Sequence, residues 1–269
     1  MPIARLSICG SDGPRRGDCP VLTLRLTFSW LTVLPVRGPA EVDRRAAARA
    51  IALAPIAGLT LGLAAAAVLW LLEPAGAAAG FAAVAVLALL TRGMHLDGLA
   101  DTFDGLGVYG PPERAREVMK SGGAGPFGVS AIVVAAGIQA GAFTALAASG
   151  HWYAVILAVA LGRVAVVAAC RRGIEPAPDT RFGALVAGTQ SWVTVAVWVV
   201  VTAAVSVFAV PGLVWPGPLV AVLSLLVAVR LADHGARRIG GLSGDLLGAA
   251  VELTTALSAL GFVAAANAV

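Results

Sequence analysis

The sequence predicts an all-α membrane protein, a polytopic bundle of about seven transmembrane helices. Hydrophobic residues make up 59% of the 269 residues, and the mean hydropathy is +0.89. Charged residues make up only 13%, about half of the roughly 25% that is usual in soluble domains. The apolar runs are continuous and rich in Ala, Leu and Val, whereas the strands of a membrane barrel alternate in polarity. Because lipid offers no partners to backbone polar groups, these runs have to form helices.

The chain begins with a polar tail at residues 1–20, which has no apolar core and is therefore not a signal peptide. The membrane domain is predicted to occupy residues 21–269. Its first apolar segment, Val21–Val36, is short for a span and contains an arginine and a proline. It either lies in or re-enters the membrane interface, with Phe28 and Trp30 as anchors, or forms a buried piece that does not span.

Seven later runs are predicted to span the membrane. The second of them is short, and we expect it to be a tilted span whose far end continues into the polar loop that follows. In chain order the runs are Ala46–Leu72, Ala77–Met94, Phe127–Ala148, Trp152–Cys170, Trp192–Val210, Leu213–Ala232 and Leu246–Ala266.

Basic residues predict how the bundle is oriented. All of the 19 Lys and Arg residues except Arg163 lie before or near the start of the first span, or at or near the connections that follow the second, fourth and sixth spans. The other connections, at residues 73–76, 149–151 and 211–212, contain none. By the positive-inside rule, the N-terminus is therefore cytoplasmic and the C-terminus lies outside.

The composition also excludes several classes of protein. The net charge of +4 comes from arginines that lie along one face of the bundle and serve as orientation signals. Nucleic-acid binding is therefore not expected. Three cysteines are too few for a disulfide-stapled secreted domain. An apolar, weakly charged chain is not intrinsically disordered.

The densest polar cluster lies at Thr91–Phe127, between the second and third spans. It contains His95 and three aspartates, Asp97, Asp101 and Asp104, whose spacing puts their carboxylates on one face of a helix. Such like charges repel unless a cation lies between them, and Mg²⁺ takes carboxylate oxygens while leaving positions open for phosphates. We therefore predict a Mg²⁺ site at the aspartates; the alternative is a solvated acidic face. His95 is a ligand, a proton carrier or a hydrogen-bond partner of a neighbouring carboxylate.

A glycine-rich segment precedes the third span. It contains Lys120, Gly122, Gly123 and Gly125. Glycines let backbone amides approach an anion, and a helix N-terminus favours negative charge. We predict that this segment binds substrate phosphate, with a flexible loop as the alternative.

A second acidic pair opens the last span. Asp245 and Glu252 are seven residues apart and face the same way, and Glu252 lies about two turns into the membrane. Both are predicted at the substrate site; the alternative for Glu252 is a pair with Arg163, which is also within a span. Arg181, in a cytoplasmic loop, is a further candidate for an anionic ligand, or else an anchor to lipid headgroups.

These motifs resemble the cobalamin synthase family, the adenosylcobinamide-GDP ribazoletransferases. The resemblance runs from about Leu24 almost to the C-terminus and is carried by HLDGLADTFDGL at 95–106 and GGLSGDLLGAAVEL at 240–253. It implies an enzyme that joins adenosylcobinamide-GDP to α-ribazole, or its 5′-phosphate, with release of GMP. This reaction is a Mg²⁺-dependent phosphoryl-group transfer late in cobalamin biosynthesis. The resemblance also implies a multi-pass protein of the bacterial cytoplasmic (inner) membrane, with its active-site loops on the cytoplasmic face.

The resemblance further implies how the site works. The three aspartates of 95–106 hold one or two Mg²⁺ ions across the pyrophosphate, and one of them, or His95, accepts the hydroxyl proton. Lys120 and the glycines hold phosphate oxygens, and Asp245 completes the site. The segment from Lys120 reads Lys-Ser-Gly-Gly-Ala-Gly, where the family often has Lys-Asp-Ser-Arg-Ile-Gly.

Two other classes of membrane protein are alternatives. A CDP-alcohol phosphotransferase also uses spaced aspartates, but its Asp-Gly-x-x-Ala-Arg pattern is absent here. A transporter places charges along a pathway, whereas these carboxylates gather at one surface and no inverted repeat is apparent. The sequence leaves the oligomeric state open, a homo-oligomer included.

Overall fold

The computed structural model describes residues 20–268. This part of the chain is helical and contains no β-strand beyond two isolated bridges. Its helices are α1 (Pro20–Leu31), α2 (Arg44–Ala52), α3 (Ala54–Leu71), the short η2 (Glu73–Ala75), α4 (Ala77–Leu90), α5 (Met94–Gly107), α6 (Pro112–Met119), α7 (Pro126–Ala148), α8 (Trp152–Ala169), α9 (Arg181–Val186), α10 (Trp192–Ser206), α11 (Pro216–Ile239) and α12 (Gly244–Ala266).

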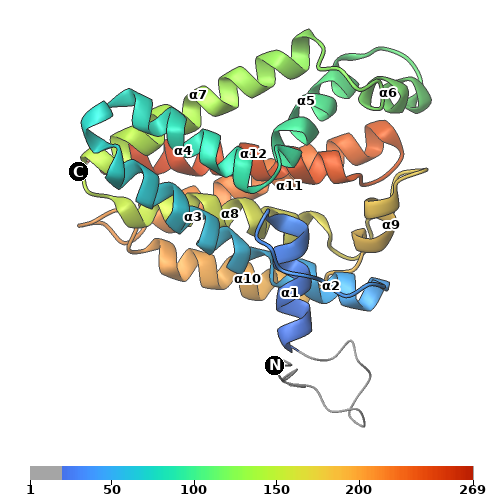
Figure 1. Cartoon of the computed structure of the whole chain (residues 1–269), viewed down its shortest axis with the longest axis horizontal. Coiled ribbons are helices and arrows are strands. Elements are labelled where there is room, and N and C mark those ends of the chain that lie inside the picture. Colours follow the sequence, from blue (N-terminus) through green and yellow to red (C-terminus); the bar gives the residue numbers. More distant parts are fainter. Residues whose placement is uncertain (1–19, 269) are drawn as a thin grey trace, which may run out of the picture.

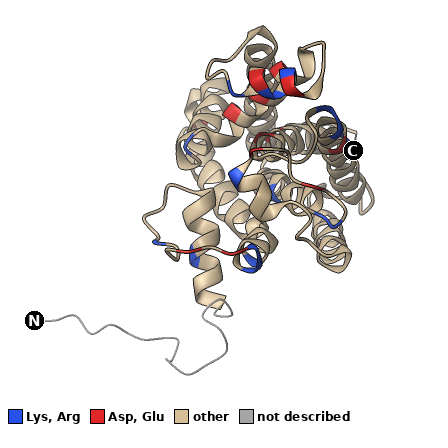
Figure 2. Ribbon diagram, turned by 90° about the vertical axis from the view of Figure 1, so that its right-hand side faces the viewer, with Lys and Arg blue, Asp and Glu red and all other residues tan. Residues whose placement is uncertain are grey.

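The long helices lie side by side as a bundle, which confirms the predicted fold class (Figure 1). The short helices α2, α5, α6 and α9 gather at one end, and η2 and the C-terminus lie at the other (Figure 1). Figure 2 looks onto the end that carries α5, α6 and α9, where many Lys, Arg, Asp and Glu residues are coloured along the ribbon. The predicted polar tail at 1–20 lies, except for its last residue, outside the described residues.

Five helices of the described part are long and apolar enough to cross a membrane: α3, α7, α8, α11 and α12. The bent pair of α4 and α5 passes the same test as one unit, and α10 is apolar but has 15 residues. With the α4–α5 pair counted as one segment, they correspond in order to the seven predicted spans, although only five of these segments, or six with the bent pair, are long and apolar enough to cross a membrane. The chain is a multi-pass membrane protein.

Two of the predicted spans are wrong in detail. The first, Ala46–Leu72, is divided at Leu53 into α2 and α3, because Pro55 has no amide hydrogen to donate and is favoured in the first turn of a new helix. The second does not continue smoothly into the polar loop. The chain bends by 93° between α4 and α5, and α4 alone has only 14 residues.

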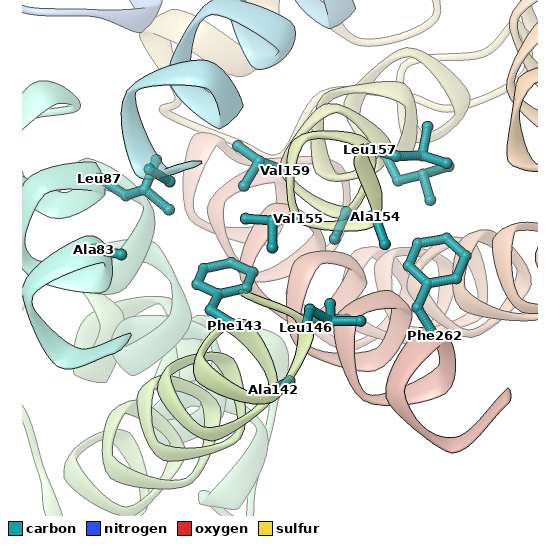
Figure 3. Packing of buried hydrophobic residues seen from close by; sticks show 14 of the residues in the cluster. Ala83, Leu87, Ala142, Phe143, Leu146, Ala154, Val155, Leu157, Val159 and Phe262 are labelled. Carbon is teal, nitrogen blue, oxygen red and sulfur yellow. The ribbon is translucent and has the colours of Figure 1, made fainter. Parts of the chain in front are cut away.

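The core of the bundle is built around α8, of which 83% is buried. Phe143 and Leu146 of α7 meet Val155 and Val159 of α8 there, and Phe262 of α12 packs into the same cluster (Figure 3). The rest of this core is largely alanine, which lets helices approach closely where no aqueous driving force exists between them. The polar end is therefore carried on a closely packed frame.

The apolar segment Val21–Val36 is helical only up to Leu31, as part of α1, a helix of 12 residues that packs against α2 and α3. At about 18 Å it is too short to cross a hydrocarbon layer of about 30 Å. Thr27 Oγ1 donates to the carbonyl oxygen of Ala50 in α2 over 3.0 Å, and the amide of Val33 donates to Leu90 of α4 over 2.7 Å. These bonds fix α1 to the charged end of the bundle.

Candidate active site

The site begins at the bend between α4 and α5. Arg92 and Gly93 have φ values of 59° and 68°, in the left-handed region that favours glycine. This turn directs α5 across the first turns of α12, where Gly98 lies against the backbone of Asp245. A methyl group on Gly98 would come within 2.8 Å of the carbonyl oxygen of Asp245, so the crossing needs a residue without a side chain. It brings the aspartates of α5 next to Asp245, two regions far apart in the sequence.

The four aspartates that the sequence singled out meet at this crossing, but in different surroundings. Asp97 is exposed, Asp101 and Asp245 are half-buried, and Asp104 is buried. Asp97 and Asp245 line the same pocket. The carboxylate of Asp101 lies within electrostatic range of the other three. This is a concentration of negative charge that a divalent cation would relieve.

Asp104 accepts hydrogen bonds with both of its carboxylate oxygens. The amide of Gly125 donates to Oδ2 over 2.6 Å, and the amide of Gly128 donates to Oδ1 over 2.9 Å. Asp104 therefore fixes the glycine segment and binds the N-terminal turn of α7, a position that favours a carboxylate. The amide of Gly125, predicted to hold phosphate, is directed at Asp104 instead.

The main pocket has a volume of about 450 Å³, within the range of small-ligand sites. Its acidic side consists of Asp97 and Asp245, and Arg92 supplies a cation. Trp30 of α1 and Phe182 of α9 form an aromatic side, with ring centroids 5.2 Å apart in an edge-to-face arrangement. The sequence indicated Trp30 only as an interface anchor, and nothing in it pointed to Phe182 or Arg92.

His95 also lines this pocket, and its ring is held from behind by α8. Nη2 of Arg163 lies 3.4 Å from Nδ1 of His95, and Nη1 donates to the carbonyl oxygen of Val159 over 3.3 Å. Both His95 and Arg163 are buried, at 7% and 4% exposure. The structure thus gives His95 an arginine partner, where the sequence offered a neighbouring carboxylate.

Glu252 lies deeper in the bundle. It accepts a hydrogen bond of 2.7 Å from Nε2 of Gln139, which reaches across from α7. Arg163 lies within electrostatic range of Glu252, but the two side chains do not form the ion pair that was the alternative prediction. The pocket residues Gly248 and Val251 lie one turn and one residue before it on α12.

A second, smaller pocket of about 270 Å³ is lined by the glycine segment, including Gly123 and Gly125. Gly122 and Gly123 face open space. Lys120 is exposed, and its Nζ lies 4.0 Å from the Asp179 carboxylate. The structure therefore places Gly123 and Gly125 in a pocket beside Asp104, outside the main pocket, and does not place Lys120 or Gly122 among the residues that line either one.

Arg181 is the first residue of α9 and is exposed. Its neighbour Phe182, not Arg181, lines the main pocket.

The short helix α6 covers the outer side of α5. Arg116 donates to the carbonyl oxygen of Ile239 in α11 over 2.7 Å and to Glu113 over 2.8 Å. A hydrogen bond to its own backbone amide, and then the Arg116 bond, lower the pKa of Glu113. Met119, at the end of α6, packs against Gly105. The charged loop is thereby docked on the helix that carries the aspartates.

The donor set suits Mg²⁺ by its chemistry, since it consists of carboxylates. Within residues 20–268, no three His, Cys, Asp or Glu side chains are already arranged around a common point as metal ligands. Because both oxygens of Asp104 accept amide hydrogens, Asp97, Asp101 and Asp245 are the carboxylates best placed to receive a cation.

Comparison with known proteins identifies relatives that match most of the chain. Residues 23–263 match the model of the cobalamin-5-phosphate synthase family. A protein of Corynebacterium efficiens named adenosylcobinamide-GDP ribazoletransferase is 39% identical over 251 residues, which cover 90% of this chain and 91% of the relative. A protein of the same name from a Nocardioides species is 41% identical over 243 residues, covering 89% and 97%. No solved structure matches. The chain belongs to the cobalamin-5-phosphate synthase family.

Proposed function

We propose that this protein is an adenosylcobinamide-GDP ribazoletransferase. It joins adenosylcobinamide-GDP to α-ribazole, or to α-ribazole 5′-phosphate, and releases GMP. The observation that carries the proposal is the meeting of Asp97 and Asp245 in one pocket at the charged end of a membrane bundle. Relatives that are 39% and 41% identical over nearly their whole length carry the name of this activity.

The reaction is a displacement at phosphorus. The ribose hydroxyl of the ribazole forms a new bond to the cobinamide-side phosphorus, the bond from that phosphorus to the GMP oxygen breaks, and GMP leaves with the bonding electrons. Such transfers depend on alignment and charge neutralisation more than on a covalent nucleophile. Asp97, exposed in the pocket, is placed to accept the hydroxyl proton. Arg92 offers a positive charge to a phosphate oxygen.

We propose Mg²⁺ as the cofactor, held by Asp97 and Asp101 with Asp245 across the helix crossing. The ion would neutralise charge on the pyrophosphate. Asp104, which the sequence also suggested as a ligand, fixes the glycine segment. Gly123, which lines the second pocket, would bind phosphate there together with the exposed Lys120, which precedes the lining residue Ser121. Localisation in the bacterial cytoplasmic membrane, with the N-terminus cytoplasmic, belongs to the same proposal.

The test is a reconstituted assay. The purified protein in lipid vesicles receives adenosylcobinamide-GDP and α-ribazole 5′-phosphate, with Mg²⁺ or with EDTA, and GMP and the corrinoid product are quantified. We expect both products in equal amounts with Mg²⁺ and neither with EDTA. Absence of GMP in the presence of both substrates and Mg²⁺ would reject the proposed reaction, and equal rates in EDTA would reject the metal.

A further inference from the structure

The main pocket has an aromatic side that the proposed chemistry at phosphorus does not use. Trp30 and Phe182 come from α1 and α9, two short helices at the charged end of the bundle (Figure 1). Their rings make an edge-to-face contact, with an angle of 68° between the planes. Both residues are only half-buried and both line the pocket, so part of each ring is available to a ligand.

The Trp30 side of this pair is held in place by Arg92. Nη2 of Arg92 donates to the carbonyl oxygens of Ser29, over 3.0 Å, and Thr32, over 3.2 Å, on either side of Trp30. These bonds satisfy carbonyls at the end of α1 that have no partner within the helix. The bond from Thr27 to Ala50 then fixes α1 to α2.

The Phe182 side of the pair is held by α2, the helix to which α1 is also bonded. Arg44 of α2 donates to the carbonyl oxygens of Ala184 and Ala187, the latter over 2.7 Å, and so binds the end of α9. α1 and α9 are therefore both bonded to α2. A wall that is fixed before a ligand arrives loses little freedom on binding, which favours affinity.

We propose that Trp30 and Phe182 form a subsite for the planar heteroaromatic base of a nucleotide substrate. The inference rests on the proposed function. A nucleotide has a flat base at one end and phosphate at the other. In the pocket, the rings of Trp30 and Phe182 suit the base, and Arg92 together with the cation proposed at the carboxylates suits the phosphate. Aromatic side chains stack on any base, because every base has a π-face.

The size of the pocket supports a nucleotide as the occupant. A volume of about 450 Å³ is in the range of small-ligand sites, whereas a corrin ring with its substituents has to remain largely outside. Two bases take part in the proposed reaction: the guanine of adenosylcobinamide-GDP and the benzimidazole of α-ribazole. Both have the required flat ring, and the experiment separates them.

The test compares Trp30→Leu and Phe182→Leu with the wild type in vesicles, measuring KM for each substrate separately and kcat. Each variant is expected to raise one KM about tenfold, the loss of one stacking contact, while the other KM and kcat change less than about twofold. A higher KM for adenosylcobinamide-GDP identifies guanine as the stacked base. A rise for α-ribazole 5′-phosphate identifies benzimidazole. Trp30→Phe keeps a smaller ring and is expected to raise the same KM less.

Trp215→Leu is the matched control, because Trp215 is 61% exposed and precedes α11 at the opposite end of the bundle. It is expected to leave both KM values unchanged. Unchanged KM values in Trp30→Leu and Phe182→Leu would overturn the subsite, and so would a fall in kcat alone, which indicates a structural effect.

Direct binding separates this inference from the proposed function. GMP and α-ribazole 5′-phosphate are each applied to the wild type and to Trp30→Leu in equilibrium dialysis. If the wild type binds one of them and Trp30→Leu binds it about tenfold more weakly, the subsite stands even where no turnover is found. If the wild type binds neither ligand, the subsite is rejected on its own measurement.

Discussion

Asp97 and Asp104 lie two turns apart on α5, yet their carboxylates meet opposite conditions. The carboxylate of Asp97 is exposed in the pocket and is free to meet a ligand. The carboxylate of Asp104 is buried and accepts two amide hydrogens from the start of α7. Two aspartates that look equivalent by spacing therefore differ: Asp97 is open to a ligand, whereas Asp104 holds the backbone of the glycine segment, and mutation distinguishes them.

Asp97→Asn is expected to lower the rate of GMP release at least about 100-fold, because the change removes the charge that holds the cation and the proton acceptor. The protein should still insert into the membrane and unfold at the wild-type temperature, since Asp97 is exposed. Release of GMP over a range of Mg²⁺ concentrations is the measurement. Glu73→Gln, at the opposite end of the bundle, is the control and should turn over normally. Near-normal turnover by Asp97→Asn would remove this residue from the catalytic site.

Asp104→Asn is expected to act first on stability. The amide group keeps one acceptor oxygen but turns a donor NH₂ toward a donor amide, so a buried donor loses its partner at a cost of about 1–3 kcal/mol. Thermal unfolding in detergent should show a lower midpoint than for Asp97→Asn. An unchanged midpoint together with a lost rate would place Asp104 among the ligands, as its spacing in the sequence suggested.

At the scale of helices, the site depends on how closely α5 crosses α12. Gly98 of α5 lies against Asp245, and Gly248 of α12 lies against His95. Each helix thus places a glycine against the backbone of the other, and the absence of side chains lets the two backbones approach closely, as small residues do in membrane bundles. The distance between Asp97 and Asp245, and hence the shape of the pocket, follows from this contact.

Gly98→Ala is expected to lower kcat about 100-fold, since a methyl group 2.8 Å from the carbonyl oxygen of Asp245 pushes the helices apart and misaligns the carboxylates. Gly137→Ala, on α7, is the matched control: a methyl group there meets open space, and alanine stabilises a helix by about 0.5–1 kcal/mol relative to glycine. The rate of GMP release and the unfolding midpoint are measured for both. Equal rates in both variants would show that the close crossing is not needed.

Polar side chains inside the bundle also join two pairs of helices, α8 with α5 and α7 with α12. Arg163 of α8 reaches His95 of α5, and Gln139 of α7 donates to Glu252 of α12. Arg163→Met and Glu252→Gln are each expected to destabilise the protein, because each removes a charge that lies within electrostatic range of the opposite charge inside the bundle. The double variant should lose less than the sum of the two, with a coupling of about 0.5–3 kcal/mol in unfolding experiments. Additive losses would mean that the two charges act independently.

At the scale of the whole molecule, the order of the apolar helices could be predicted from the sequence, and the number of spans approximately, because lipid requires long apolar runs and those are local features. The bend after α4 could not, since Arg92 is an unusual residue for a left-handed turn and its side chain is satisfied by α1. The spacing of Asp97, Asp101 and Asp104 in the sequence already placed them on one face of a helix. Trp30 and Phe182 were not found as a pair, because only the packing of α1 and α9 against α2 brings them together.

Charge and topology together predict how the protein is oriented in the membrane. Apart from Arg163, the basic residues of the sequence lie before or near the start of the first span, or at or near every second connection, and charged residues are seen at the end of the bundle that faces the viewer in Figure 2. A reporter active only outside the cytoplasm, fused after Leu213, is expected to be active, because the α10–α11 connection lies at the end without basic residues. The same reporter after Gly122 should be inactive, and a fluorescent cytoplasmic reporter should show the reverse at both positions. Activity of the exported reporter after Gly122 would invert the bundle and put the aspartates on the side away from nucleotide substrates.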